Sequence, residues 1–145
     1  DMNSRAPENV LIANGHRLTE PRQRLIAILS QWPSRFSAGE LVKAARKAEP
    51  PIGRATVFRT LGLLLELGIV ERVRGADDSE GYVVARRGDH HHHLVCSSCG
   101  RVEDLPLCPV EGRLKELAAE RRFQVQGHNL EVYGLCEGCV KADEK

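Results

Sequence analysis

The sequence predicts a mixed α/β protein of the α+β type that is built from two modules. Apolar residues recur with helical spacing through most of residues 8–68, and two short β-type runs, "IVERVRG" and "GYVVA", follow them. After residue 90 the pattern changes to strands around one amphipathic helix, framed by two Cys-x-x-Cys pairs. We therefore expect a first module over residues 1–85, a hinge over 86–89 and a second module over 90–145.

Three or four helices are expected in the first module, because each candidate has a start or stop signal of its own. Helices followed by a two-stranded wing are the order of elements in a winged helix-turn-helix domain. The signals are Gly15 at the end of a helix over 8–15, Thr19 as the cap of the second helix, the capping-box pair Ser37 and Glu40 for the third, and Gly53 and Gly68 at the two ends of the fourth.

The second module is expected to be a small α+β unit. "HLVC" and "RVEDL" are short β-type runs, and "NLEVYGLC" is expected as the final strand, followed by a charged tail. Between them, "VEGRLKELAAERR" predicts an amphipathic helix with one apolar side. That side consists of Val110, Leu114, Leu117 and Ala118.

Composition and charge narrow the class of protein. The 145 residues are 41% hydrophobic and 28% charged, which is typical of a chain that buries a core. Residues 1–74 carry twelve Arg or Lys against seven Asp or Glu, whereas residues 75–145 carry nine against thirteen. A basic first half suits a nucleic-acid-binding module. No apolar run approaches the ~18 residues of a membrane span, and no secretory leader is evident. We expect a cytoplasmic protein without a membrane partner.

Four of the five cysteines form two matched pairs. Cys96 and Cys99 make one Cys-x-x-Cys knuckle, and Cys136 and Cys139 make the other. Four thiolates at this spacing can enclose Zn²⁺ in a tetrahedron without leaving an open position for a substrate. The 36 residues between the knuckles must fold as a strand–helix–strand unit. The pattern therefore predicts a structural zinc site rather than a catalytic one.

Four consecutive histidines precede the first knuckle, in "DHHHHLVCSSCG". Affinity tags lie at chain ends, so a tag does not explain a run in the middle of the chain. If the run is extended, His91 and His93 point to one side of the strand while His90 and His92 point to the other. One ion cannot easily collect all four imidazoles. The run is better interpreted as two half-sites, back to back.

Each half-site needs further ligands. Imidazole with one or two carboxylates suits Zn²⁺, Fe²⁺, Mn²⁺ or Ni²⁺, and the ligand types alone do not choose among these ions. Cys108 is expected as a half-buried thiol, although it lies close enough to Glu111 in sequence to serve as an occasional ligand. The other candidates are Glu111, His128, Asp104, Glu103, Asp89 and Glu71.

Residues 17–139 resemble the ferric uptake regulator family of bacterial metal-responsive repressors. The resemblance is carried by "GHRLTEPRQRLIAIL", "GRATVFRTLGLLLELGIVERV", "HHHHLVCSSCG" and "GHNLEVYGLCEGC", in this order. It implies a winged-helix DNA-binding domain, a hinge and a C-terminal dimerisation domain. It also implies a homodimer that binds a palindromic double-stranded DNA operator when loaded with metal, and no small-molecule substrate.

The resemblance implies roles for particular residues. The four knuckle cysteines match the family's structural zinc ligands. A second site within the dimerisation domain is implied for His90, His92, Glu111 and His128. His91 and His93 match the imidazole pair of a sensing site that straddles the hinge.

The sensing site is where this sequence departs from its relatives. Arg35 stands where members usually supply a His from the DNA-binding domain, and "VVARRGD" offers no ligand before its Asp89. Glu71 and Asp104 align with acidic ligands of the zinc-sensing and peroxide-sensing branches. The site is therefore either rebuilt from Glu71, Asp89 or Asp104, which we expect, or weakened. Four uninterrupted histidines favour the zinc uptake regulator branch, with iron-sensing and peroxide-sensing members as alternatives.

The fourth helix is expected to read DNA. A recognition helix lies in the major groove and presents the residues of its first turns to base edges, while other cations hold phosphates. Phe58 stands where the family usually has Tyr, which retains apolar contact but loses a hydroxyl. The expected contacts are Arg54, Thr56, Phe58 and Arg59 on this helix, with Arg17, Arg22 and Arg24 nearby.

Two other classes of function are less consistent with the sequence. A zinc hydrolase or deaminase needs an open coordination position and a general base, and neither His-Glu-x-x-His nor the deaminase signature occurs. We therefore do not expect an enzyme. A zinc-binding protein without DNA function is the remaining alternative, and salt-dependent, sequence-selective duplex binding would distinguish it from a repressor.

Overall fold

The computed structural model describes residues 6–32, 34–85, 92–105 and 107–144. The chain divides into two compact units. The first runs to Arg74 and continues from Asp78 through the end of the wing, and the second comprises Gly75–Asp77 with the C-terminal residues. The predicted hinge at 86–89 lies outside the described residues. Among those that are described, no helix combines the length and apolar character needed to cross a membrane.

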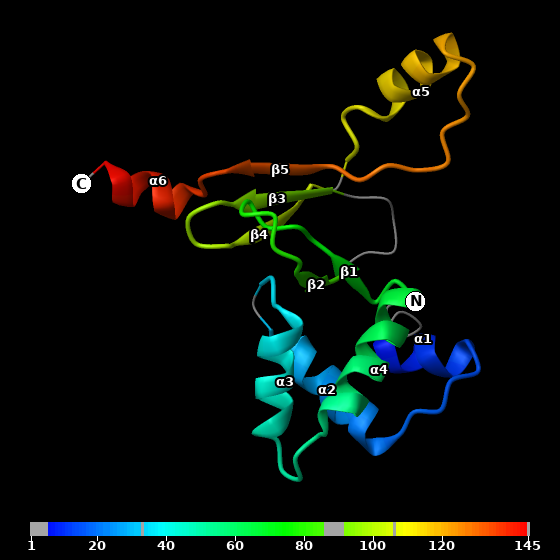
Figure 1. Ribbon diagram of the computed structural model, residues 1–145, viewed down its shortest axis with the longest axis vertical. Helices are drawn as coiled ribbons and strands as arrows, with labels where there is room; N and C mark the ends of the chain where they lie inside the picture. Colours follow the sequence, from blue (N-terminus) through cyan, green and yellow to red (C-terminus); the bar gives the residue numbers. More distant parts are fainter. Residues whose placement is uncertain (1–5, 33, 86–91, 106, 145) are drawn as a thin grey trace. The chain divides into compact units, whose positions relative to one another are not determined.

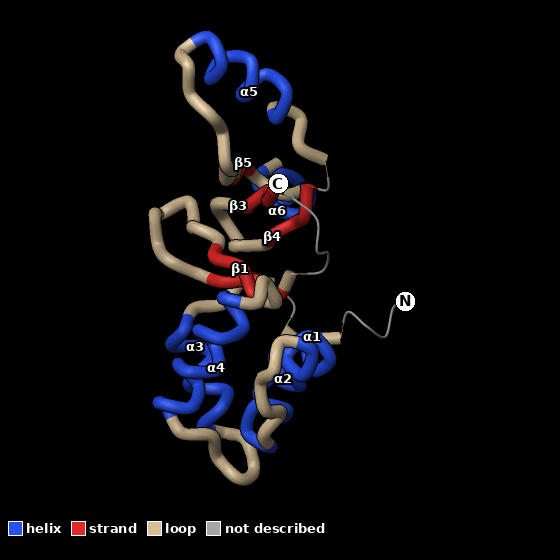
Figure 2. The backbone as a smooth tube through the Cα atoms, turned by 90° about the vertical axis from the view of Figure 1, so that its right-hand side faces the viewer, coloured by secondary structure: helices blue, strands red, loops and turns tan. Residues whose placement is uncertain are grey.

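The first unit contains four helices followed by a two-stranded antiparallel sheet (Figure 1). The predicted order of a winged helix-turn-helix is confirmed. In Figure 2 the helices lie grouped together. The elements are α1 (Pro7–Ala13), α2 (Glu20–Ser30), α3 (Ala38–Arg46), α4 (Arg54–Glu66), β1 (Val70–Arg72) and β2 (Tyr82–Val84).

Local signals determine where these helices begin and end. The Thr19 hydroxyl accepts a hydrogen bond from the backbone N–H of Arg22, which caps α2. Ser37 and Glu40 form both hydrogen bonds of the predicted capping box of α3. Gly68 follows α4 with φ of 70°, a left-handed conformation that costs a glycine little.

The core of the first unit joins the helices to the wing. Leu25, Leu41 and Leu64 come from three different helices and are fully buried together. The Phe36 ring lies 5.3 Å from that of Trp32 and 5.8 Å from that of Tyr82 on β2. Backbone hydrogen bonds link Phe36 and Tyr82 in both directions, at 2.9 and 2.8 Å. The wing is thus attached to the segment before α3 through both backbone and rings.

The second unit is built on a three-stranded sheet in the order β4–β3–β5. Strand β3 pairs antiparallel with β4 and parallel with β5, so the chain crosses over through α5 between β4 and β5. The elements are β3 (His92–Cys96), β4 (Val102–Leu105), α5 (Glu111–Glu120), β5 (Glu131–Gly134) and α6 (Glu137–Asp143).

Two features of the second unit differ from the sequence prediction. The predicted charged tail forms α6, which begins beside the second knuckle and contains an i,i+4 ion pair between Glu137 and Lys141 at 2.5 Å. The predicted amphipathic helix is present as α5, but none of its residues is buried. Leu114, on its expected apolar side, is 37% exposed, while Leu117 and Ala118 are half-buried, so the single chain covers this side only in part.

Candidate metal centres and nucleic-acid interface

The parallel pairing of β3 and β5 explains why the four knuckle cysteines meet. Cys96, the last residue of β3, is aligned with Gly134, the last residue of β5. Because both strands run in the same direction, the turn after each one leaves the sheet at the same end. Cys99 follows β3 and Cys136 follows β5 at this end. The cysteine pairs, 36 residues apart in sequence, are therefore neighbours in space.

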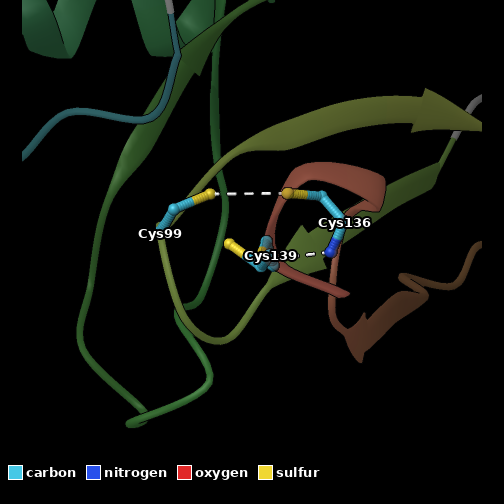
Figure 3. A group of neighbouring side chains, drawn as sticks. Cys99, Cys136 and Cys139 are labelled. Carbon is cyan, nitrogen blue, oxygen red and sulfur yellow. Dashed lines mark hydrogen bonds between the residues drawn. The ribbon is translucent and has the colours of Figure 1, made fainter. Parts of the chain in front are cut away.

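We call Cys96, Cys99, Cys136 and Cys139 the four-cysteine group. Their sulfur atoms all lie within 4.8 Å of one another. Figure 3 shows the sulfurs of Cys99 and Cys136 pointing toward each other, 3.7 Å apart, with that of Cys139 beside them. Zn–S bonds of about 2.3 Å place the sulfurs of a zinc tetrahedron roughly 3.8 Å apart. The four-cysteine group thus fits a structural zinc site, as the spacing predicted.

Backbone hydrogen bonds hold the first knuckle in shape. Gly100 donates its N–H to the carbonyl of Cys96 at 3.0 Å and has a positive φ of 77°, which closes the turn. Ser97 donates its N–H to the carbonyl of Gly134 at 2.8 Å, and its hydroxyl donates to the same carbonyl at 3.0 Å. These bonds attach the first knuckle directly to the end of β5.

The thiols of the four-cysteine group differ in acidity. Backbone N–H groups of Cys99 and Cys136 lower the pKa of Cys96 to about 6. Ser98 donates a hydrogen bond that lowers the pKa of Cys139, but the thiols of Cys136, Cys96 and Cys99 outweigh it and raise that pKa to about 12. Four thiolates this close together repel one another strongly, so a divalent cation is needed to keep all four ionised.

A second cluster lies at the opposite end of β3 and comprises His92, Cys108 and His128. We call it the imidazole–thiol cluster. The Nε2 atoms of His92 and His128 are 3.1 Å apart, and the Cys108 sulfur lies 3.1 Å from Nε2 of His128. Their candidate ligand atoms all lie within 4.8 Å of one another. His92 is buried, with 2% of its surface exposed, and Cys108 and His128 are half-buried.

The second site implied by the resemblance is only partly assembled. His92 and His128 come together, as that assignment requires. Glu111, the first residue of α5, accepts a hydrogen bond from Lys115 at 2.9 Å and is not among the clustered ligand atoms. His90 lies outside the described residues. The ligand roles of Glu111 and His90 therefore stay predictions.

Cys108 is the residue of this cluster that sequence reasoning undervalued. It stands alone between "LPL" and "PVEG", without the paired spacing that identified the other four thiols. Its distance of three residues from Glu111, an implied ligand, was the one signal that made it an occasional ligand, and the half-burial expected of its thiol is confirmed. Its approach to His128 depends on the path of the chain from β4 to α5, and the spacing of ligand residues along the sequence does not specify that path.

On the other face of β3, His93 lies beside Asp104 of β4. The two residues are paired across the strands, and Nε2 of His93 is 3.8 Å from Oδ1 of Asp104. The His93 side chain is 8% exposed. Two predicted sensing-site residues are thus neighbours. His91 and Asp89 lie outside the described residues, Glu71 belongs to β1 of the first unit, and Glu103 forms an ion pair with Arg101 at 2.9 Å.

Arg35 has a structural role where relatives were expected to supply a metal-binding His. Its Nε donates to the carbonyl of Val73 at 2.9 Å, and its Nη2 donates to the carbonyl and hydroxyl oxygens of Ser79 at 2.6 and 3.0 Å. The guanidinium lies against Gly81, where an added Cβ would overlap it. Arg35 therefore holds together the two sides of the wing between β1 and β2.

The first turns of α4 present an exposed polar and aromatic surface. Val57, Leu61 and Leu64 of the same helix are buried, which turns Arg54, Phe58 and Arg59 outward. Phe58 is 42% exposed, and the guanidinium of Arg54 lies 5.1 Å from its ring centroid. Thr56 accepts from Arg59 at 3.5 Å. This surface has the positive charge and apolar contact expected of a recognition helix.

The other predicted DNA contacts lie at the start of α2. Arg17 is exposed, and its carbonyl accepts a hydrogen bond from Nη1 of Arg22 at 2.5 Å. Arg24 differs from the expected picture of a free phosphate contact, because its Nη2 is buried without a hydrogen-bond partner among the described residues. Arg17 and Arg22 can therefore approach a phosphate more readily than Arg24.

The chain is similar to metal-uptake regulators over nearly its whole length. A profile of the ferric uptake regulator family matches residues 13–133. The ferric uptake regulation protein of Legionella pneumophila is 34% identical over 126 residues, covering 86% of this chain and 92% of the relative. The zinc uptake regulation protein of Escherichia coli is 31% identical over 140 residues, covering 94% of this chain and 80% of the relative.

Solved structures agree with these sequence relatives. A zinc uptake regulator in complex with zinc and DNA has a TM-score of 0.79 and 29% identity, and covers 95% of this chain and 93% of its own. A zinc-bound manganese uptake regulator has a TM-score of 0.65 and 28% identity, with coverage of 91% and 99%. With two clusters of metal-ligating side chains in one unit and a winged helix in the other, the chain belongs to the ferric uptake regulator family of metal-dependent DNA-binding transcription regulators.

Proposed function

We propose that this protein is a zinc-sensing repressor of metal-homeostasis genes, which binds palindromic operators as a homodimer in the cytoplasm when loaded with metal. The observation that carries this proposal is the imidazole–thiol cluster. A structural zinc at the four-cysteine group would stabilise the unit, whereas a second cluster of ligand atoms at the other end of β3 offers a site whose occupancy can vary.

The ligand types support zinc as the sensed ion. The four-cysteine group provides sulfur, and the second cluster provides imidazole nitrogen with one thiol. Thiolate and imidazole suit Zn²⁺, whereas Mn²⁺ prefers oxygen ligands. The similarity to the Escherichia coli zinc uptake regulation protein and to the zinc uptake regulator solved with zinc and DNA supports the same choice. Iron-sensing relatives of comparable identity make iron the alternative.

The partly uncovered side of α5 supports a homodimer. A helix with an apolar side normally buries it, yet no residue of α5 is buried in the single chain. On β5, Val132 and Tyr133 are each 43% exposed, and Leu135 just beyond the strand is 46% exposed. Exposed apolar side chains on a strand and a helix of the same unit are surface that a protein–protein interface could bury. A second copy of the second unit is the partner that the family implies.

The sensing mechanism would depend on metal beyond the structural zinc. We propose that this regulatory metal binds both at the imidazole–thiol cluster and at the predicted sensing residues His91, His93, Asp104 and Glu71, and that its binding favours the state of the protein that binds DNA. A ligand changes such an equilibrium only by its differential affinity for the two states. A coupling of about 1–3 kcal/mol would change operator affinity roughly 5–150-fold.

Selection from a random duplex library tests the proposed function. We expect the zinc-loaded protein to enrich a palindromic sequence, and we expect a protein treated with a strong chelator to enrich none. The affinity for the selected duplex should fall with increasing salt. Recovery of the same palindrome at equal affinity after chelation, with the dimer intact in sedimentation, would show that metal does not regulate binding. Failure to enrich any sequence in either state would favour a zinc-binding protein without DNA function.

The proximity of His93 and Asp104 favours one further candidate within the family, a peroxide sensor. Asp104 aligns with an acidic ligand of that branch, and its carboxylate lies 3.8 Å from the His93 imidazole. In such a sensor, hydrogen peroxide oxidises a histidine beside bound iron. Mass spectrometry after exposure to iron and peroxide would detect added oxygen on His91 or His93. Unchanged masses at both residues would exclude this candidate.

A further inference from the structure

We propose that the Cys108 thiolate is a metal ligand of the second site, together with the imidazoles of His92 and His128. This inference deepens the proposed function and rests on it, because it specifies the donor set of the regulatory metal. The resemblance assigned two of these residues but gave the acidic position to Glu111. The geometry instead brings a sulfur to the two imidazoles.

The distances within the cluster are close to those between the ligands of a bound metal. The two imidazole Nε2 atoms are 3.1 Å apart, and the Cys108 sulfur is 3.1 Å from one of them. Bonds of about 2.0–2.1 Å to nitrogen and 2.3 Å to sulfur place the ligands of a tetrahedral zinc roughly 3.3–3.6 Å apart. An expansion of a few tenths of an ångström would therefore admit the ion.

The position of Glu111 argues against its replacing Cys108. Its side chain is 48% exposed, and its Oε1 accepts a hydrogen bond from Lys115 one turn further along α5. Cys108 is half-buried and precedes α5, on the segment that returns from β4. Three donors leave one position of a tetrahedron, which Glu111 could take after releasing Lys115. Cys108 needs no such exchange.

The hydrogen bonds of the cluster show what a metal would displace. The backbone N–H of Leu130 donates to Nδ1 of His92 at 3.2 Å, which assigns the lone pair to Nδ1 and the proton to Nε2. That Nε2–H points at His128. Coordination through Nε2 requires the proton of the neutral imidazole to move to Nδ1, which breaks the hydrogen bond from Leu130, and it requires the Cys108 thiol to release its proton. Metal binding here is therefore coupled to proton release.

A sulfur ligand determines which ions the site favours. Thiolate is a soft donor that selects Zn²⁺ over Mn²⁺, whereas a carboxylate in the same position would favour the harder ions. The two imidazoles can bind any of the candidate metals, so the third donor, thiolate or carboxylate, decides which metal the site prefers. Cys108 is the specificity-determining ligand in this interpretation, and its replacement by Asp should move the preference toward Mn²⁺ and Fe²⁺.

Cobalt spectroscopy on the full-length protein tests the inference. One equivalent of Zn²⁺ first fills the four-cysteine group, and alkylation mapping verifies this because four thiols are then protected while Cys108 still reacts. Co²⁺ is added next. We expect a thiolate-to-cobalt charge-transfer band in the near ultraviolet and loss of Cys108 alkylation. In Cys108→Ser the band should disappear, and the affinity for a second Zn²⁺ should fall about 100-fold, since even outer-shell changes cost 10–100-fold.

Glu116→Gln, an exposed position on the same helix whose carboxylate pairs with Arg113, is the matched control and should retain the band. A band of unchanged intensity in Cys108→Ser, or undiminished alkylation of Cys108 after Co²⁺ addition, would overturn the inference. Intact secondary structure by circular dichroism shows that the variants fold. Operator binding is measured separately. If the cobalt results hold while no duplex is bound, the proposed function fails and the ligand assignment stands. If duplex binding depends on metal while the cobalt band is absent, the ligand assignment fails and the proposed function stands.

Discussion

Neighbouring side chains of β3 contact different partners because a strand turns successive residues to opposite faces. His92 lies in the imidazole–thiol cluster, whereas His93 lies beside Asp104. The alternation expected from four consecutive histidines is therefore present in the two that the structure describes. It would allow one short strand to supply ligands to two separate metal sites, while the Cys96 thiol at its far end belongs to the four-cysteine group.

Arg35 illustrates how one residue can replace metal-dependent order with hydrogen bonding. Its guanidinium donates three hydrogen bonds across the wing and occupies the space above Gly81. Arginine keeps its charge at all physiological pH values and has a rigid fork of donors. We infer that the wing is held together within the first unit even when no metal is bound.

The first prediction concerns this contact. Gly81→Ala should displace the Arg35 guanidinium and destabilise the protein by about 1–3 kcal/mol, as expected for lost hydrogen bonds to a charged donor. Urea unfolding measures the change. Gly62→Ala is the matched control, because nothing lies near an added Cβ there and alanine favours the helix, so its stability should be equal or higher. If Gly81→Ala costs the same in an Arg35→Ala background, the two residues are not coupled.

The sequence predicts a helix well where residues close in sequence determine its first or last turn. The capping box of α3, the Thr19 cap of α2 and the stop of α4 at Gly68 all depend on residues close in sequence. The α6 helix was missed because "EGCVKADEK" has little apolar periodicity. Its stabilising contacts, an N-terminal acid and the Glu137–Lys141 pair, are weak signals that also occur in solvated tails.

The second prediction concerns α4 as a recognition helix. Arg59→Ala should lower affinity for the selected operator by about 1–3 kcal/mol and relax specificity at one position, if Arg59 contacts a base edge. Fluorescence anisotropy with operator and random duplexes measures both effects. Lys141→Ala removes one positive charge from α6 and should leave both affinities unchanged. An equal loss on both duplexes for Arg59→Ala would place that side chain on phosphates instead.

The third prediction concerns α5 as part of the interface between copies. Leu114→Glu places a charge on the partly uncovered apolar side, so it should shift the protein from dimer to monomer at micromolar concentration. Analytical ultracentrifugation measures the shift. Arg113→Gln, which removes an exposed residue paired with Glu116 on the same helix, should leave the dimer intact. A dimer of unchanged stability in Leu114→Glu would place the interface elsewhere.

At the scale of the whole molecule, the sequence predicts the two modules and their main features better than it predicts the ligands of the second site. Two modules, a winged helix and a four-cysteine group follow from spacing, capping and charge. The proposed participation of Cys108 could not follow from these, because it depends on how the chain travels from β4 into α5. The predicted sensing site includes Glu71 and residues outside the described ranges, so its ligand set stays a prediction.

The central claim is that occupancy of a second metal site controls DNA binding while the four-cysteine group stays filled. The most direct test is an anisotropy titration of the operator with protein that carries one Zn²⁺ per chain, compared with protein that carries a second equivalent. The account predicts operator affinity about 5–150-fold higher after the second equivalent, with the dimer present in both states. Equal affinity in the two states, with both zinc contents verified by elemental analysis, would contradict it.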